Sequence, residues 1–129
     1  MIVGLGTDIV EIERIASMIE RHGDVFVGRV FTPAEREYCS TKKHAAQHYA
    51  GRWAAKEAAM KALGTGFIPG VGWHDFEILP LRSGAPKLAI TGGAADKAKS
   101  LGIHEIHITM SHCRTYATAT AIAVGPGAV

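Results

Sequence analysis

Two carboxylates and a lysine are the residues of this sequence best suited to chemistry. Glu57 and Lys61 lie four residues apart in an alanine-rich segment, and Asp8 lies near the end of an apolar, β-branched run. Proteins commonly hold Mg²⁺ with one or two carboxylates, while substrate phosphates and water complete its coordination. Asp8 and Glu57 are therefore candidate magnesium ligands, and Lys61, one helical turn from Glu57, is a candidate phosphate ligand.

Each of these residues also has a purely structural interpretation. A Glu57–Lys61 pair at i,i+4 stabilises a helix by about 0.2–0.5 kcal/mol without any catalytic role. Asp8 precedes a predicted helix and has Glu11 three residues later, which is the spacing of a capping box. The residues alone leave both interpretations open.

Other motifs give weaker evidence for a function. Residues 64–66 (GTG) are not a Walker A loop, because no Gly-Lys-Ser/Thr follows them. His44 and His48 have the i,i+4 spacing of a metal pair, but no third ligand is evident, and we expect surface histidines. The two cysteines, Cys39 and Cys113, are too few for a disulfide framework and indicate a reducing compartment.

The elements that position these residues follow from hydrophobic periodicity. Glycine-terminated periodic segments predict helices over residues 11–22, 45–63 and 94–101. Thr32, Pro33 and Glu35 match a capping box at a further helix start. Alternating or β-branched runs predict strands over residues 2–10, 76–79, 87–91, 105–110 and 117–124. The pattern is α+β, with a mainly antiparallel sheet packed on a long helix.

Two predicted elements have distinctive faces. The last strand has alanines on one side, at residues 117, 119, 121 and 123, where a helix or another subunit can approach closely. The first helix groups Ile12, Ile15, Ala16 and Ile19 on one face. Arg14, Met18 and Arg21 cluster on the opposite face, about 200° from Ile12. Two arginines are ordinary on a solvated face, whereas a methionine between them is typical of a partner contact.

Length and composition limit the class of protein. The chain has 129 residues and a formal net charge of +2. This length suits one domain, residues 1–129, and the mild charge argues against binding nucleic acid through backbone neutralisation. No apolar run approaches the roughly 20 residues that span a bilayer, and no basic signal-peptide region opens the sequence. We therefore expect a cytoplasmic protein with no membrane segment.

Several motifs, in order along nearly the whole chain, resemble one enzyme family. They are GTDIVEIERI from residue 6, Phe-x-x-Arg-x-Phe-Thr-x-x-Glu from residue 26, GRWAAKEAAMKALGTG from residue 51, Gly84-x-Pro86, and Ser111-His112 before Tyr116-Ala117. Together they resemble holo-[acyl-carrier-protein] synthase, the short bacterial type of 4′-phosphopantetheinyl transferase. The WAAKEA segment, with the lysine and glycines after it, is highly specific.

The resemblance implies an α+β homotrimer with active sites between subunits. It also implies Mg²⁺-dependent transfer of 4′-phosphopantetheine from coenzyme A to a serine of apo acyl carrier protein, in support of fatty acid biosynthesis. Adenosine 3′,5′-bisphosphate is the expected second product. The magnesium carboxylates of the family match Asp8 and Glu57, and its phosphate-contacting lysine matches Lys61, so these three form the expected catalytic group.

Further contacts are implied by the same resemblance. The family contacts suggest Gly64, Thr65 and Gly66 by the nucleotide, Pro86 near the adenine, and Ser111 and His112 near the 3′-phosphate. Arg52 lies about 140° around the helix from Glu57, so it would serve coenzyme A bound by a neighbouring subunit. The family docks its acidic carrier protein on the first helix, where Arg14 matches and shares a face with Met18 and Arg21. We expect this face to point away from the nucleotide loop.

Three alternatives stay open. The serine proton is accepted by a metal-bound water or by a carboxylate such as Glu57. The acceptor is a fatty-acid carrier protein or a carrier domain of a polyketide or peptide synthase. A non-catalytic nucleotide-binding module is a different class, which the presence of Asp8, Glu57 and Lys61 disfavours.

Overall fold

The structure is a computed structural model that describes residues 1–66 and 68–127. Its helices are α1 (Ile12–His22), α2 (Asp24–Val30), α3 (Pro33–Ser40), α4 (Ala45–Leu63) and α5 (Gly92–Ser100), with a short 3-10 turn, η1, at Trp73–Asp75. Its strands are β1 (Ile2–Glu11), β2 (Phe76–Pro80), β3 (Pro86–Ile90), β4 (Glu105–His112) and β5 (Tyr116–Val124). No helix among the described residues is long and apolar enough to cross a membrane.

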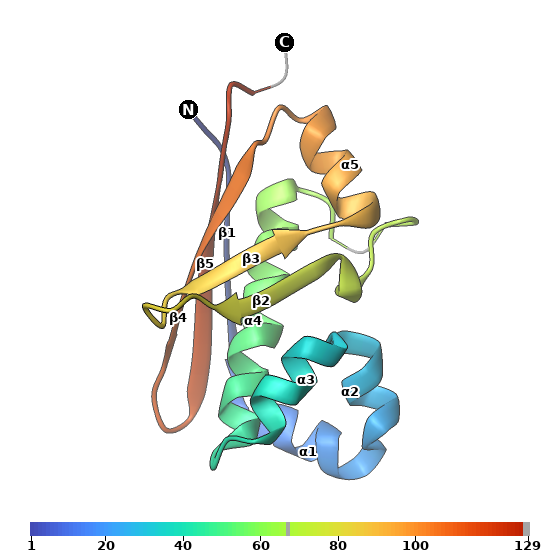
Figure 1. Cartoon of the computed structure of the whole chain (residues 1–129), viewed down its shortest axis with the longest axis vertical. Coiled ribbons are helices and arrows are strands. Elements are labelled where there is room, and N and C mark those ends of the chain that lie inside the picture. The colour runs from blue at the N-terminus through green and yellow to red at the C-terminus, as the bar shows by residue number, and fades with distance from the viewer. Residues whose placement is uncertain (67, 128–129) are drawn as a thin grey trace.

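Two antiparallel sheets accompany α4. β1, β5 and β4 form a three-stranded sheet in that order, and β2 pairs with β3. Figure 1 shows α4 running along the three-stranded sheet, with α1–α3 gathered at one end of the molecule and α5 at the other. The predicted α+β class and the antiparallel pairing are confirmed.

Small residues let α4 pack closely on the sheet. A Cβ built on Gly6 would lie 1.9 Å from the carbonyl oxygen of Ala58, and one on Gly4 would lie 2.0 Å from that of Ala62. These glycines therefore continue β1 under the helix instead of breaking the strand. The four alanines of β5 lie under the same helix, and even Ala119, the most accessible of them, is only 1% exposed. A helix of the same chain, and not another subunit, thus covers the alanine face.

The opposite face of the three-stranded sheet is accessible and partly apolar. Leu5 and Ile9 of β1 are 62% and 61% exposed, and Tyr116 of β5 is 43% exposed. Their positions in the antiparallel register place all three side chains on the face away from α4. Large apolar side chains gathered on one face are typical of an interaction surface.

A buried ion pair fixes α4 against the helices and the smaller sheet. Thr32 and Glu35 form the predicted capping box at the start of α3. Glu35 also accepts a hydrogen bond from the Ile78 amide at 2.9 Å and pairs with Lys56 Nζ at 2.6 Å. Both charged side chains are fully buried. Because Lys56 precedes Glu57 on α4, this pair also fixes the rotation of the helix that presents Glu57.

Near the N-terminus the structure decides one open alternative and adds one helix. Asp8 is not a helix cap, since it lies inside β1, and α1 begins after Glu11 without any side-chain cap. Residues 24–30 form the unpredicted helix α2. This helix has only seven residues, which is too short for a clear 3.6-residue period.

Candidate active site

Asp8 and Lys61 meet where α4 crosses β1. Asp8 pairs with Ala119 in the sheet register, and like Gly6 it lies on the side facing α4. Its Oδ1 is 3.2 Å from Lys61 Nζ, and that ammonium also donates a hydrogen bond to the Thr7 carbonyl at 2.9 Å. The Asp8 side chain is 15% exposed and that of Lys61 is 53% exposed. The carboxylate is therefore sheltered, while the lysine remains open to a ligand.

Glu57 belongs to the same group electrostatically. Burial, followed by the negative charge of Asp8, raises the pKa of Glu57, whereas Lys61 and Arg14 act in the opposite direction. The Glu57–Lys61 ion pair allowed by helical spacing is not formed among the described residues, because Lys61 pairs with Asp8 instead. β1 and α4 thus bring the three expected catalytic side chains together.

These donors suit a hard divalent cation whose coordination a substrate completes. Asp8 contributes to the raised pKa of Glu57, which shows that the two carboxylates repel each other, and a divalent cation would relieve that repulsion. No group of three or more histidine, cysteine or acidic side chains placed to hold a metal occurs in the described part of the chain. A pair of carboxylates fits Mg²⁺ with phosphate ligands rather than a closed protein cage.

The segment after α4 begins one turn beyond Lys61. Gly64 caps the helix with a left-handed φ of 72°, and its amide donates to the Lys61 carbonyl. The Thr65 amide donates to the Met60 carbonyl at 3.3 Å, and the Thr65 hydroxyl donates to the Gly66 carbonyl at 3.1 Å. The predicted nucleotide residues therefore adjoin the Asp8–Glu57–Lys61 group.

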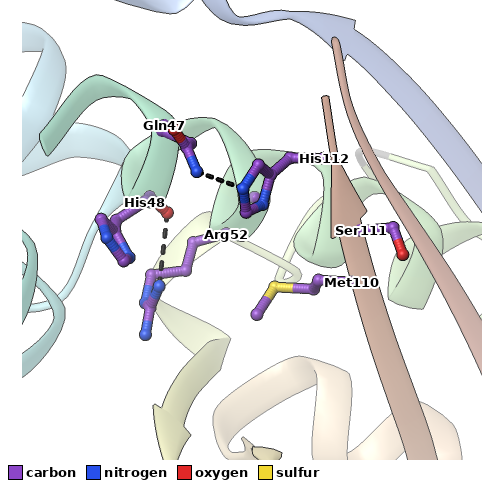
Figure 2. Close-up of a pocket in the computed structure, with 7 residues that line it drawn as sticks. Gln47, His48, Arg52, Met110, Ser111 and His112 are labelled. Carbon is purple, nitrogen blue, oxygen red and sulfur yellow. Dashed lines mark hydrogen bonds between the residues drawn. The ribbon is translucent and has the colours of Figure 1, made fainter. Parts of the chain in front are cut away.

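A second group lines a small cavity between α4 and β4. The cavity has a volume of about 70 Å³, and its lining residues are Gln47, His48, Gly51, Arg52, Met110, Ser111 and His112. Figure 2 shows Gln47 hydrogen-bonded to His112, with His48 and Arg52 neighbouring each other on α4. Ser111, His112 and Arg52 all line this cavity, but Figure 2 shows the Ser111 side chain pointing to the opposite side of β4 from His112 and away from Arg52.

Sequence reasoning missed Gln47 and His48 at this cavity. They precede Gly51 and Arg52 by four residues each, so helical spacing places them on the same side of α4. Helical spacing, counted back from Gly51 and Arg52, would therefore have identified Gln47 and His48 as candidates. His44 is exposed and lines a different cavity, with Ile12 and Arg114, so the two histidines do not share a pocket.

Hydrogen bonds within the same chain fix the Arg52 side chain. It is 4% exposed, its Nε donates to the Ile78 carbonyl at 3.0 Å, and Nη1 donates to the His48 carbonyl at 3.3 Å. Its guanidinium lies 4.5 Å from the centroid of the Tyr38 ring. Burial, and then the charge of Arg52, lowers the pKa of His48. A fixed cation beside an imidazole that gains a proton when an anion binds suits a phosphate group.

Pro86 lies apart from both groups. It begins β3 and pairs with Pro80 on the β2–β3 hairpin. Neither the Asp8–Glu57–Lys61 group nor the cavity lining includes it.

The arginine face of α1 is less separate from the catalytic group than the sequence predicts. Met18 is half-buried against the core and lines a groove of about 180 Å³ with His22, Val25, Phe26 and Arg29. The Arg14 guanidinium lies 5.9 Å from the centroid of the Trp53 ring, and its charge acts on Glu57. The expectation that this face is remote from the site therefore does not extend to Arg14.

Comparisons with known proteins find relatives that match nearly the whole chain. Residues 4–121 match the family model of the 4′-phosphopantetheinyl transferase superfamily. Holo-[acyl-carrier-protein] synthase of Koribacter versatilis is 51% identical over 122 residues, which cover 95% of this chain and 98% of that protein. The protein of the same name from Desulforudis audaxviator is 49% identical over 126 residues, covering 98% of this chain and 95% of its own.

Solved structures show the same fold. The crystal structure of holo-[acyl-carrier-protein] synthase from Neisseria meningitidis superposes with a TM-score of 0.89 at 31% identity, covering 96% of this chain and 99% of that one. The Helicobacter pylori enzyme in complex with coenzyme A gives 0.82 at 28% identity, covering 93% of this chain and 99% of its own. The chain therefore belongs to the 4′-phosphopantetheinyl transferase superfamily.

Proposed function

We propose that residues 1–129 act as one domain, a holo-[acyl-carrier-protein] synthase. The enzyme transfers 4′-phosphopantetheine from coenzyme A to a serine of an apo acyl carrier protein and releases adenosine 3′,5′-bisphosphate. The observation that carries the proposal is the meeting of Asp8, Glu57 and Lys61 at the crossing of β1 and α4. Relatives that this chain matches over nearly their whole length are named for this activity.

Asp8 and Glu57 would hold Mg²⁺. When bound, the ion supplies positive charge that stabilises the phosphate oxygens in the transition state. Lys61 would exchange part of its contact with Asp8 for an oxygen of the diphosphate. Burial raises the pKa of Glu57 in the metal-free protein, and Glu57 is one of the two candidate bases for the serine proton.

The transfer is a substitution at phosphorus. The serine oxygen forms a bond to the β-phosphorus of coenzyme A and loses its proton to a base. The bond between that phosphorus and the bridging oxygen breaks, and its electron pair leaves with adenosine 3′,5′-bisphosphate. Positioning and charge neutralisation carry most of the catalysis in such a reaction.

Two regions would bind the nucleotide part of coenzyme A. Gly64, Thr65 and Gly66 adjoin Lys61 and would contact the nucleotide. The cavity that contains Arg52, with Ser111 and His112, would take the 3′-phosphate. Pro86 is proposed to contact the adenine on the family resemblance alone. Relatives from Helicobacter pylori and Bacillus anthracis have been crystallised with coenzyme A, which supports it as the substrate.

We further propose a homotrimer that associates through the outer face of the three-stranded sheet. Leu5, Ile9 and Tyr116 make this face apolar. A cavity of about 330 Å³ on it is lined by Ile9 and Tyr116 together with Ser111, His112, Cys113 and Thr118. A neighbouring subunit on this face would therefore lie beside the proposed 3′-phosphate residues, so that one coenzyme A could contact two chains.

The carrier protein would dock on α1 through Arg14, Met18 and Arg21. An acidic helix suits the two arginines, and the groove beside Met18 offers apolar contact. We propose that the enzyme acts in the cytoplasm in support of fatty acid biosynthesis.

Release of adenosine 3′,5′-bisphosphate tests the proposed reaction. The protein is mixed with coenzyme A, Mg²⁺ and apo acyl carrier protein, and the nucleotide product is separated by chromatography. We expect one nucleotide released per carrier protein consumed, and none when the carrier serine is replaced by alanine. Coenzyme A binding without release would instead indicate a non-catalytic nucleotide-binding module.

A further inference from the structure

The segment between α4 and η1 is packed tightly against the first turn of α5. A Cβ built on Gly93 would lie 1.6 Å from the carbonyl oxygen of Gly70. One built on Gly92 would lie 2.8 Å from Oδ1 of Asp75, and Gly92 also has a left-handed φ of 58°. Because the Gly93 contact is with backbone, any side chain there would push residue 70 away from α5.

Asp75 joins the two sides of this junction by accepting hydrogen bonds from both. Its Oδ2 accepts from the Gly72 amide at 3.3 Å and from the Ala94 amide at 3.0 Å. Its backbone carbonyl accepts from the Thr91 amide at 2.9 Å. Thr91, the residue at the N-cap position, makes no side-chain cap bond, so Asp75 caps α5 from a distant part of the chain.

The other end of the segment leads directly to the catalytic group. Gly64 follows Lys61 by three residues and ends α4. η1 is itself held in place, because the Trp73 carbonyl accepts from the buried Lys56 ammonium at 3.2 Å. The described parts of the segment, residues 64–66 and 68–72, therefore run between two fixed supports, α4 on one side and the η1–α5 junction on the other.

We infer that α5 is a support for this segment, and that Gly93 and Asp75 are positioning residues for coenzyme A. The inference rests on the proposed function, in which residues 64–66 contact the nucleotide. Gly93 and Asp75 act through the backbone of residues 70–72. Their loss should therefore weaken nucleotide binding and spare the carrier-docking helix α1, which lies at the opposite end of the molecule (Figure 1).

Variants of the full chain test this inference by calorimetry with adenosine 3′,5′-bisphosphate as the probe. Gly93→Ala and Asp75→Ala should each weaken binding at least tenfold and change the KM for carrier protein less than twofold. Asp75→Asn keeps an acceptor oxygen and should recover most of the affinity. Gly125→Ala is the matched control, because its Cβ would lie 2.1 Å from the Gly102 carbonyl oxygen, beyond the far end of α5. This control should lose thermal stability but keep the parent affinity.

Hydrogen–deuterium exchange gives a readout that needs no ligand. Amides in residues 68–72 should exchange faster in Gly93→Ala, whereas those of α4 should exchange as in the parent protein. Parent-like nucleotide affinity in both Gly93→Ala and Asp75→Ala, whatever their thermal stability, would overturn the inference and leave the proposed function intact. Failure of the parent protein to bind the nucleotide would overturn the proposed function and the inference with it.

Discussion

Lys61 forms an ion pair with Asp8, 53 residues away in sequence, and not with Glu57, one turn earlier on its own helix. The ammonium therefore partly neutralises the carboxylate that lies under α4. Binding of a divalent cation and a diphosphate would supply new partners to both charges. The ion pair thus orients the Asp8 carboxylate and the Lys61 ammonium in the absence of ligands.

The first prediction concerns the two carboxylates. Asp8→Ala and Glu57→Gln should each lower kcat by roughly a hundredfold or more, because a metal ligand contributes several kcal/mol to the transition state. The loss of folding stability from Asp8→Ala should stay within about 1 kcal/mol, since Lys61 is largely exposed. Steady-state kinetics at saturating Mg²⁺ and urea denaturation measure both quantities. Near-parent kcat in either variant would remove that residue from the metal site.

The second prediction concerns assembly. Light scattering should give three times the chain mass of 13.7 kDa. Leu5→Glu combined with Ile9→Glu should dissociate the protein and abolish activity, because both side chains lie on the outer sheet face. Val25→Glu is the control for assembly alone and should leave the trimer mass unchanged, since Val25 is 67% exposed but lies on α2, away from this sheet face. A monomeric mass for a fully active parent protein would refute the shared-site proposal.

The third prediction separates carrier docking from catalysis. Arg21→Glu should raise the KM for carrier protein about tenfold or more and leave the KM for coenzyme A unchanged. Arg14→Glu should alter both kcat and the carrier KM, because its charge also acts on Glu57. The effect of Arg21→Glu should shrink with added salt, which screens exposed charges within about 8 Å at physiological ionic strength. An unchanged carrier KM in a variant that combines Arg14→Glu with Arg21→Glu would exclude α1 from the docking surface.

The fourth prediction concerns the buried ion pair behind Glu57. Lys56→Met should cost about 3–5 kcal/mol of folding stability, because it leaves the fully buried Glu35 carboxylate unpaired. Adding Glu35→Gln should recover part of this loss, since the amide oxygen still accepts the Ile78 hydrogen bond without a buried charge. Urea denaturation compares the three proteins. A loss below about 1 kcal/mol in Lys56→Met would contradict the role assigned to the pair.

The fifth prediction concerns pH. Burial and the charge of Arg52 lower the pKa of His48 in the free protein, whereas a bound phosphate dianion favours the protonated imidazole. The pKa of His48 should therefore be higher in the complex, and affinity should fall as pH rises through that value. Between pH 7 and 8.5, above the second pKa of a phosphate monoester at about 6, calorimetry should show adenosine 3′,5′-bisphosphate binding becoming weaker as pH rises.

His48→Gln and a second ligand provide controls for this pH dependence. The variant should show a flatter pH profile, because one titrating group is gone. Adenosine 5′-monophosphate lacks the 3′-phosphate, so its affinity should not change with the protonation of His48. Identical pH profiles for the parent and His48→Gln would show that this histidine does not face the bound phosphate.

Local patterns predicted much of the fold. The bounds of α4 and the capping box at Thr32 follow from helix formers, a glycine stop and an adjacent Thr-Pro pair. The contact between Lys61 and Asp8 was not predictable, because spacing along one helix favours Glu57 as the partner of Lys61. Only the close approach of α4 to β1 at Gly4 and Gly6 brings Asp8 within reach.

For the same reason, the sequence predicted only some of the residues of the candidate site. Asp8, Glu57 and Lys61 lie in specific local motifs that resemble a known family. His48 carries no such signal, because its place beside Ser111 and His112 depends on how β4 packs near α4. The alanine face of β5 allowed either a helix or a subunit as its cover, and only the three-dimensional arrangement distinguishes the two.

The most direct test of the proposed activity is the intact mass of the acceptor. Apo acyl carrier protein is incubated with coenzyme A, Mg²⁺ and either this protein or its Glu57→Gln variant, and each carrier is then weighed by mass spectrometry. We predict that the parent protein adds the mass of one phosphopantetheinyl group, at the carrier serine, and that the variant adds almost none in the same time. A carrier protein of unchanged mass after prolonged incubation with the folded parent protein would contradict the account.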